Sequence, residues 1–255
     1  MEALPIHIHF YEKDRYPGYE KEFINILDEA GIQKVVVFAN NKPDETPNEC
    51  IFNLKSEFPD RIIGISEIDL KDKNVLNKMK EYVQKYKMSG FKVFPSRCNC
   101  YPDDKKVFPV YQKAIELNVP IVFHSGRIPD EFEKYGLNKF AQPIYLDEVA
   151  VRFPELKIVI SHSGNPMFEQ TLMVGNRSNI YIDVCGVTDR WRDKFKQLYA
   201  IYGADRIMHG GPNHDHKLSL KAYVDDMMNV LSEENVDIES RKKIMAQNAK
   251  RVFNT

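Results

Sequence analysis

The sequence predicts a single-domain α/β protein with the (β/α)₈, or TIM, barrel fold over residues 1–255. Three observations predict it. Short apolar runs alternate with longer amphipathic stretches, there are eight such runs, and 255 residues is a typical length for this barrel. An open doubly wound sheet shows the same alternation but usually has fewer strands, and no G-x-G-x-x-G motif follows the first run. No linker or repeat interrupts the chain, which indicates one domain.

The expected strands are short and rich in β-branched or apolar residues, as buried parallel strands are. Their connections are too long for hairpins and suit right-handed crossovers. The eight are Leu4–His9, Lys34–Ala39, Ile62–Ile68, Gly90–Pro95, Val119–His124, Lys157–His162, Ile180–Val184 and Arg206–Gly210.

Amphipathic stretches between these runs predict the outer helices. Gly31 stands where a C-cap glycine belongs, and Pro109 falls in the first turn of its helix, where a missing N–H costs little. The expected helices include Glu20–Ala30, Val75–Lys87, Val107–Leu117, Leu146–Phe153, Asp193–Tyr202 and a closing helix over Ile238–Phe253.

Composition narrows the function. The formal net charge is -1, from 36 basic and 37 acidic residues, so no global field attracts nucleic acid or an anionic membrane. No apolar run approaches the ~18 residues that span a bilayer, and no leader pattern opens the chain, so a cytoplasmic protein is expected. The four cysteines are expected to be reduced thiols, since the C-x-C of Cys98 and Cys100 lacks the paired spacing of a zinc ribbon. The remaining partner class is a small molecule, and a homo-oligomer is compatible with the sequence.

The seven histidines gather near the C-terminal ends of the expected strands. In a barrel these ends form one rim, where active sites are built. The histidines are His7, His9, His124, His162, His209, His214 and His216.

The pair His7 and His9 predicts a metal site. Residues two apart on a strand face the same side, so both imidazoles can reach one cation at ~2.0–2.1 Å. A third nitrogen from His124 would give a divalent metal three protein ligands and leave positions open for water. This layout is typical of a catalytic metal site, although a hydrogen-bonded core role is the alternative for any one of these histidines.

Three further residues have open roles. Lys92 either points into the barrel, where its ammonium could bind a substrate carboxylate, or lies outside as a solubilising charge. Arg127, three residues after His124, suits either a carboxylate substrate or a surface salt bridge. Asp183 on the seventh strand is expected to be a buried carboxylate that supports the metal ligands rather than a ligand itself.

Several motifs in order and spacing make the chain resemble the amidohydrolase superfamily, in the branch of aminocarboxymuconate semialdehyde decarboxylase. These motifs are Ile6-His7-Ile8-His9, Gly90-Phe91-Lys92-Val93-Phe94-Pro95, Phe123-His124-Ser125-Gly126, Ile160-Ser161-His162-Ser163-Gly164, Asp205-Arg206-Ile207-Met208-His209-Gly210 and Asn248-Ala249-Lys250-Arg251-Val252-Phe253. The resemblance runs nearly end to end.

The resemblance implies that His7, His9 and His124 bind a divalent metal, with zinc expected and manganese as the alternative. It implies that His162 orients or activates the metal-bound water or the substrate. A metal lowers the pKa of bound water towards ~7, which supplies hydroxide at neutral pH.

The chain departs from the family pattern at strand eight. The family usually has Gly-Ser-Asp or Gly-Thr-Asp there, and the aspartate binds metal and acts as a base. Here Pro212 stands at that position, and proline can neither bind a metal nor move a proton. Asp215 is expected to act as the displaced base, with His214 as the alternative. Pro5 also replaces the aspartate that often precedes the histidine pair.

Three functions remain open. The first is a metal-dependent hydrolase of a small carboxylated ester, lactone or amide, with His162 and Asp215 catalytic and with Lys92 and Arg127 binding the substrate. The second is a metal-dependent decarboxylase on the same site. The third, motivated by Pro212, is a metal-free or non-catalytic barrel that binds a ligand.

Overall fold

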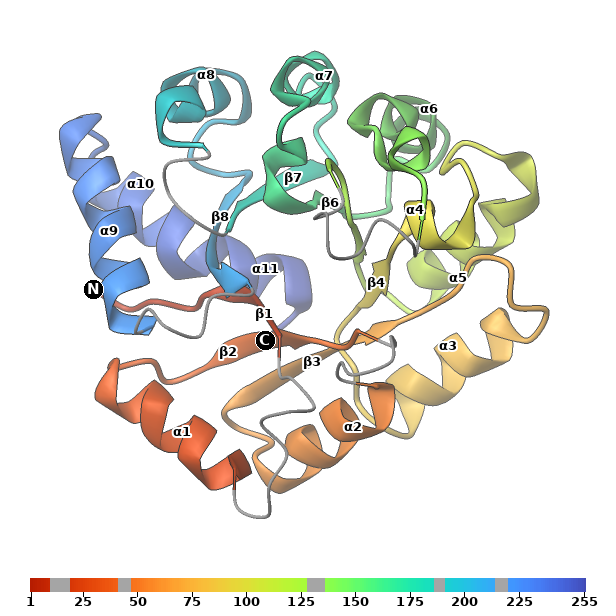
Figure 1. The fold of residues 1–255 in the computed structure, drawn as a ribbon, viewed down its shortest axis with the longest axis horizontal. Helices are drawn as coiled ribbons and strands as arrows, with labels where there is room; N and C mark the ends of the chain where they lie inside the picture. The colour runs from red at the N-terminus through yellow and green to blue at the C-terminus, as the bar shows by residue number, and fades with distance from the viewer. Residues whose placement is uncertain (10–18, 41–46, 128–135, 186–190, 214–219) are drawn as a thin grey trace.

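The computed structural model describes residues 1–9, 19–40, 47–127, 136–185, 191–213 and 220–255, with the backbone alone of residues 212 and 213. Eight parallel strands close into a barrel in the order β1 to β8, which confirms the predicted (β/α)₈ fold. Figure 1 shows helices forming an outer ring around the strands.

Each strand lies within or close to its predicted run. The strands are β1 (Ile6–His9), β2 (Val35–Phe38), β3 (Ile62–Glu67), β4 (Phe91–Val93), β5 (Ile121–Phe123), β6 (Ile158–Ile160), β7 (Ile180–Val184) and β8 (Ile207–Asn213). Most are shorter than predicted by one to three residues. The strand β8 instead continues past its predicted end, through Pro212.

The helices follow the expected positions. They are α1 (Tyr19–Glu29), α2 (Asn48–Glu57), α3 (Val75–Gln84), α4 (Pro95–Cys98), α5 (Phe108–Glu116), α6 (Leu146–Arg152), α7 (Phe168–Val174), α8 (Arg192–Tyr202), α9 (Leu220–Glu233), α10 (Ile238–Lys242) and α11 (Asn248–Phe253). Gly31 has the left-handed φ of 68° expected just after α1. The predicted closing helix is interrupted by a π-helical turn at Lys243–Gln247.

Strand residues alternate between the barrel interior and the helix layer. Ile6, Phe38, Val122 and Met208 belong to the interior cluster. Residues of α11 and the turn before it join this cluster, namely Ala246, Ala249, Val252 and Phe253. The closing segment lies at the N-terminal end of the barrel, where the backbone N–H of Leu4, just before β1, donates to the carbonyl of Met245. The C-terminal strand ends are left for a site.

His209 does not join the other histidines inside the barrel. On β8, Met208 lies in the interior cluster and Ile207 in the cluster shared with the helices, so alternation turns His209 towards the helices. Its side chain is buried, and among the described residues neither ring nitrogen has a hydrogen-bond partner. Burial lowers the pKa of His209 to about 4.

This burial predicts a pH-dependent loss of stability. The unfolded chain binds a proton at His209 below about pH 6.5, whereas the folded protein does so only near pH 4, so stability falls as the pH drops through this window. The difference amounts to on the order of 3 kcal/mol at the acid end. We expect His209→Leu to lose less unfolding free energy than the wild type between pH 7 and pH 5 in urea titrations. Parallel losses in the two proteins would show that His209 is not buried as a neutral ring.

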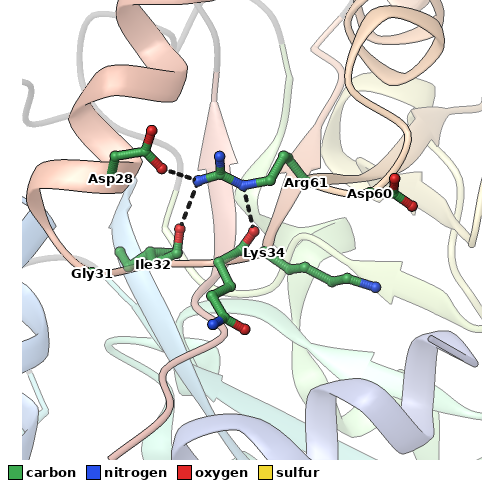
Figure 2. Close-up of a pocket in the computed structure, with 7 residues that line it drawn as sticks. Asp28, Gly31, Ile32, Lys34, Asp60 and Arg61 are labelled. Atoms are coloured by element: carbon green, nitrogen blue, oxygen red, sulfur yellow. Dashed lines mark hydrogen bonds and ion pairs between the residues drawn. The ribbon is translucent and has the colours of Figure 1, made fainter.

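A pocket of about 520 Å³ lies at the N-terminal ends of the strands, where the chain enters β2 and β3. Figure 2 shows Arg61 across it, with Nη2 donating to Asp28 and to the carbonyl of Ile32, and Nε donating to the carbonyl of Gln33. These bonds occupy the guanidinium in tying the end of α1 to the start of β3. The pocket is therefore part of the framework of the barrel.

No helix in the described ranges is long and apolar enough to cross a bilayer. All four cysteines are free thiols, as predicted, and Cys98, Cys100 and Cys185 are buried.

Candidate active site

The strand β1 breaks its alternation at the first predicted ligand. Ile6 faces the interior cluster, Ile8 packs with the helices, and His7 between them is buried and also reaches into the barrel. Two consecutive inward residues require a local kink. His7 supplies it with a left-handed φ of 65°, and the pairing of β1 with β8 shifts register at the same point. A non-glycine residue in this conformation is strained, and such strain clusters at functional sites.

Asp183, which lies on β7, holds two of the predicted site residues, His7 and His162. Its Oδ2 lies 2.9 Å from Nδ1 of His7, and its Oδ1 accepts a 2.8 Å hydrogen bond from the backbone N–H of His162. Its side chain is fully buried. A carboxylate that accepts the Nδ1 proton of a histidine fixes the tautomer and orients Nε2, the arrangement common behind metal-binding histidines.

The turn after β6 presents His162. Residues His162 and Ser163 have left-handed φ values of 58° and 48°, and Oγ of Ser163 donates to the carbonyl of Asp183. Nε2 of His162 lies 3.3 Å from Nδ1 of His124. The two predicted residues at the ends of β5 and β6 therefore meet.

Gly126 permits a close approach of the two loops that carry these histidines. It has a φ of 103°, and a Cβ there would lie 2.1 Å from the carbonyl oxygen of Asn165. Only glycine fits at this crossing of the β5 and β6 loops.

Lys92 points into the barrel and is not a solubilising charge on the outside. Its side chain is completely buried, and Nζ donates to Oγ of Ser161 at 2.5 Å and lies 3.3 Å from Nε2 of His7. The rings of Phe38 and Phe94 lie 5.0 and 5.4 Å from Nζ. Burial lowers the pKa of Lys92 to about 8, against the opposing effect of Asp183.

Cys185 follows β7 and lies between two imidazoles. Its Sγ is 3.3 Å from Nδ1 of His7 and 3.0 Å from Nδ1 of His162. The facing residue of β8 is Gly210, where a Cβ would lie 2.2 Å from the Cβ of Cys185. Burial, with Asp183 adding to it, raises the pKa of the Cys185 thiol well above its usual value. This cysteine was not among the predicted site residues, although D-x-C at a strand end places both side chains on one face.

Arg97 is a second residue near the site that was not predicted from the sequence. It lies on α4, directly after β4, and its Nη1 forms a 3.1 Å ion pair with Glu67 at the end of β3. Its guanidinium lies 3.5 Å from the ring centre of Phe94, which in turn stacks on His124. Burial is the main cause that lowers the pKa of His124 well below its usual value, followed by the charges of His162 and Lys92.

The remaining predicted residues are placed less fully. The ring of His9 is buried, 5.2 Å from the ring of His7 and 6.2 Å from that of Phe38. Arg127 is exposed, and its backbone N–H donates to the carbonyl of Asn165. Asp215 and His214 lie outside the described residues, as does the side chain of Pro212, so the proposed replacement for the strand-eight aspartate stays a prediction.

The donor set suits a divalent transition metal. Four imidazoles from β1 and the ends of β5 and β6 lie in one chain of ring contacts. Asp183 contacts the ring of His7 and accepts from the backbone N–H of His162. Imidazole and carboxylate donors bind zinc and manganese alike. The carboxylate behind His7 is the support that a ligand histidine requires. The residues present therefore fit a metal centre.

Comparisons with known proteins bear on the family and the fold of the chain. A sequence model of the amidohydrolase family matches residues 7–255. A TIM-barrel protein from Bordetella bronchiseptica, described as uncharacterized, is similar in structure with a TM-score of 0.80 and 17% identity, covering 100% of this chain and 99% of its own. No curated protein sequence matches the chain significantly.

Two similar structures are decarboxylases. The 2,6-dihydroxybenzoate decarboxylase from Rhizobium has a TM-score of 0.76 at 17% identity and covers 100% of this chain and 99% of its own. A dihydroxybenzoic acid decarboxylase from Polaromonas, with bound manganese and the inhibitor 2-nitroresorcinol, has a TM-score of 0.73 at 15% identity and covers 99% and 97%. At these identities the likeness shows a shared fold.

Proposed function

The chain belongs to the amidohydrolase family, and from this premise we propose that it is a metal-dependent decarboxylase of a small carboxylated aromatic acid. One observation carries the reaction class. A fully buried ammonium, that of Lys92, lies among His7 and the rings of Phe38 and Phe94. A cation beside aromatic faces inside the barrel matches a substrate that joins a carboxylate to a ring. The decarboxylases of the same fold act on such acids, which favours this reaction over hydrolysis.

We propose that His7, His9 and His124 hold the metal. Manganese, which the Polaromonas enzyme binds, is the first metal to test, and zinc is the second. When bound, the metal supplies Lewis acidity that polarises a substrate oxygen. Asp183 keeps the His7 ring in place from behind through its 2.9 Å contact with Nδ1.

The chain's own residues then account for binding and proton transfer. Lys92 pairs with the substrate carboxylate, and the exposed Arg127 is a second cation near the mouth. Decarboxylation breaks the bond between the ring carbon and the carboxylate, releases CO₂ and adds one proton to that carbon. His162 delivers this proton, since its ring lies between those of His7 and His124. Asp215 is proposed as the base that replaces the missing strand-eight aspartate.

Hydrolysis of a small carboxylated ester, lactone or amide is the second candidate, because the family match is to amidohydrolases as a whole. It uses the same metal and the same His162, and it differs in consuming water. A substrate panel separates the two reactions, since only decarboxylation releases CO₂.

The decisive variant for this proposal is His7→Ala, with His9→Ala beside it. We expect the purified wild type to carry about one equivalent of a transition metal by mass spectrometry and to release CO₂ from dihydroxybenzoates. Both variants should lose manganese binding and all turnover, because each removes one of the three proposed ligands. Full turnover in the metal-free variants would contradict the proposal. A wild type with neither metal nor turnover, even after reconstitution, would instead favour a non-catalytic barrel.

A further inference from the structure

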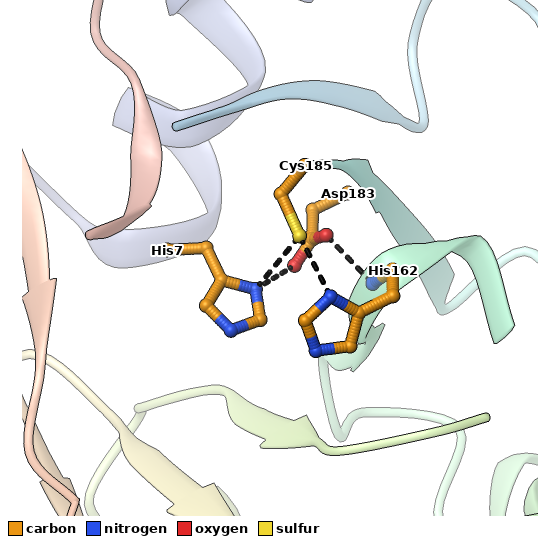
Figure 3. Close-up of side chains that lie close together, drawn as sticks. All are labelled: His7, His162, Asp183 and Cys185. Atoms are coloured by element: carbon orange, nitrogen blue, oxygen red, sulfur yellow. Dashed lines mark hydrogen bonds and ion pairs between the residues drawn. The ribbon is translucent and has the colours of Figure 1, made fainter. Parts of the chain in front are cut away.

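Four donor atoms converge inside the barrel in a way that the three-histidine centre does not use. They are Nδ1 of His7, Nδ1 of His162, a carboxylate oxygen of Asp183 and Sγ of Cys185, all within 4.8 Å of one another. Figure 3 shows the four side chains pointing at one another from β1, from the turn after β6 and from β7. Neither His9 nor His124 belongs to this group.

We propose that Cys185 is a metal ligand, and that with His7, His162 and Asp183 it forms a second donor set for a thiophilic divalent cation such as Zn²⁺ or Cd²⁺. The two sets overlap at His7. The proposal holds whether or not the chain decarboxylates a substrate, because it concerns binding alone.

The spacing of the donors suits a tetrahedral ion. Bonds of ~2.1 Å to nitrogen or oxygen and ~2.3 Å to sulfur place tetrahedral ligand atoms about 3.4–3.6 Å apart. The structure has 3.3 and 3.0 Å between Sγ of Cys185 and the two imidazole nitrogens, and 2.9 Å between His7 and Asp183. Small outward shifts of the side chains would open the group to receive the ion.

The chemistry of the donors selects the cation. A thiolate with two imidazoles and one carboxylate is a softer set than three imidazoles, so it favours Zn²⁺ or Cd²⁺ over Mn²⁺. Binding displaces the proton of the Cys185 thiol to solvent, because a coordinating thiol is deprotonated outright. Four protein ligands fill a tetrahedral shell, which is typical of a closed rather than a catalytic site.

Two features of the fold position the cysteine for this role. Gly210 leaves the space that Cys185 occupies, since any Cβ there would clash with it. Asp183 and the turn after β6 are joined by two hydrogen bonds, one from the backbone N–H of His162 and one from Oγ of Ser163. Three of the four ligands are thus held on β7 and the turn beside it.

The positive charge of Lys92 opposes binding of a metal ion to the Cys185 set. Its Nζ lies 3.3 Å from the other nitrogen of His7, so its charge repels a metal bound at Nδ1. Replacing it by the uncharged Met is therefore expected to tighten binding to the Cys185 set, an effect opposite to its expected effect on turnover.

Cobalt substitution provides the test. Co²⁺ bound by a thiolate gives an intense near-ultraviolet charge-transfer band, whereas Co²⁺ bound by histidines alone does not. We expect the wild type titrated with Co²⁺ to show this band, Cys185→Ser to lose it, and Cys98→Ser, which removes another buried thiol, to keep it. Cd²⁺ affinity measured by calorimetry should fall at least tenfold in Cys185→Ser, with circular dichroism and thermal unfolding confirming that the variant is folded.

Different experimental results would contradict the three-histidine centre and the Cys185 set. His9→Ala removes a ligand of the three-histidine set only, so it should abolish turnover and keep the charge-transfer band. Absence of the band in a wild type that binds Co²⁺, or its survival in Cys185→Ser, would overturn the role of Cys185. Neither outcome would contradict the proposed decarboxylase activity, because its metal and turnover are measured independently.

Discussion

Asp183→Asn is expected to lower metal affinity and turnover by about 10–100-fold, the usual effect of removing the carboxylate behind a ligand histidine. The substitution keeps size and shape, so the loss tests hydrogen bonding rather than packing. Asp183 has two acceptors, one for Nδ1 of His7 and one for the backbone N–H of His162.

An amide cannot satisfy both partners. If its NH₂ faces His162, two donors meet, because a backbone N–H cannot change its role. If its NH₂ faces His7, the ring must accept at Nδ1 and carry its proton on Nε2, which then points at Nζ of Lys92, 3.3 Å away. Either arrangement leaves a buried donor without an acceptor, which costs about 1–3 kcal/mol of folding free energy.

Metal titration and urea unfolding of the same variant measure both effects. Asp225→Asn is the matched control, since Asp225 is an exposed carboxylate in an i,i+4 ion pair of α9 and its loss should cost well under 1 kcal/mol. Unchanged metal affinity in Asp183→Asn would show that the carboxylate supports the fold alone. A larger loss than tenfold in Cd²⁺ affinity with unchanged turnover would show that Asp183 serves the Cys185 set and does not support the three-histidine set.

The fold was predictable because its signals are periodic. Eight apolar runs, the capping residue Gly31 and the early Pro109 each reflect a local rule of helix or strand formation, and the structure keeps them. The same alternation, applied to β8, turns His209 away from the barrel interior. Proximity to a strand end alone therefore does not predict which histidines lie in the site.

The site was only partly predictable, because its geometry departs from regular alternation. The left-handed φ of His7 and the register shift beside it turn two consecutive residues inward, and no propensity rule signals such a kink. Cys185 and Arg97 were missed for another reason. Their roles depend on neighbours distant in the sequence, His7 for the thiol and Glu67 for the guanidinium.

Lys92→Met is expected to reduce kcat/KM for a carboxylated aromatic acid by about 10²–10³-fold, comparable to removing one preorganised donor from an active site. Met fills nearly the same volume and keeps the contacts with Phe38 and Phe94, so what is lost is the charge and its hydrogen bond to Ser161. Lys92→Arg is not a conservative substitute, because a planar guanidinium does not fit a buried ammonium site.

The same substitution should raise stability. A completely buried ammonium is costly because it has left water, and here its partners are one hydroxyl and one imidazole nitrogen rather than a directly bonded carboxylate. Replacing such a charge by an apolar side chain of similar volume is often neutral or stabilising, and we expect a gain of about 1–2 kcal/mol in the free energy of unfolding.

Opposite signs for activity and stability distinguish a functional lysine from a structural one. Substrates without a carboxylate should be affected much less than carboxylated ones, which separates substrate binding from a general disturbance of the site. Lys85→Met, at an exposed lysine that follows α3, serves as the control and should change neither quantity measurably. If Lys92→Met instead unfolds the protein and Lys85→Met does not, the ammonium is a structural element of the barrel. If both variants keep full turnover, the substrate carboxylate binds elsewhere, and Arg97 and Arg127 become the next cations to replace.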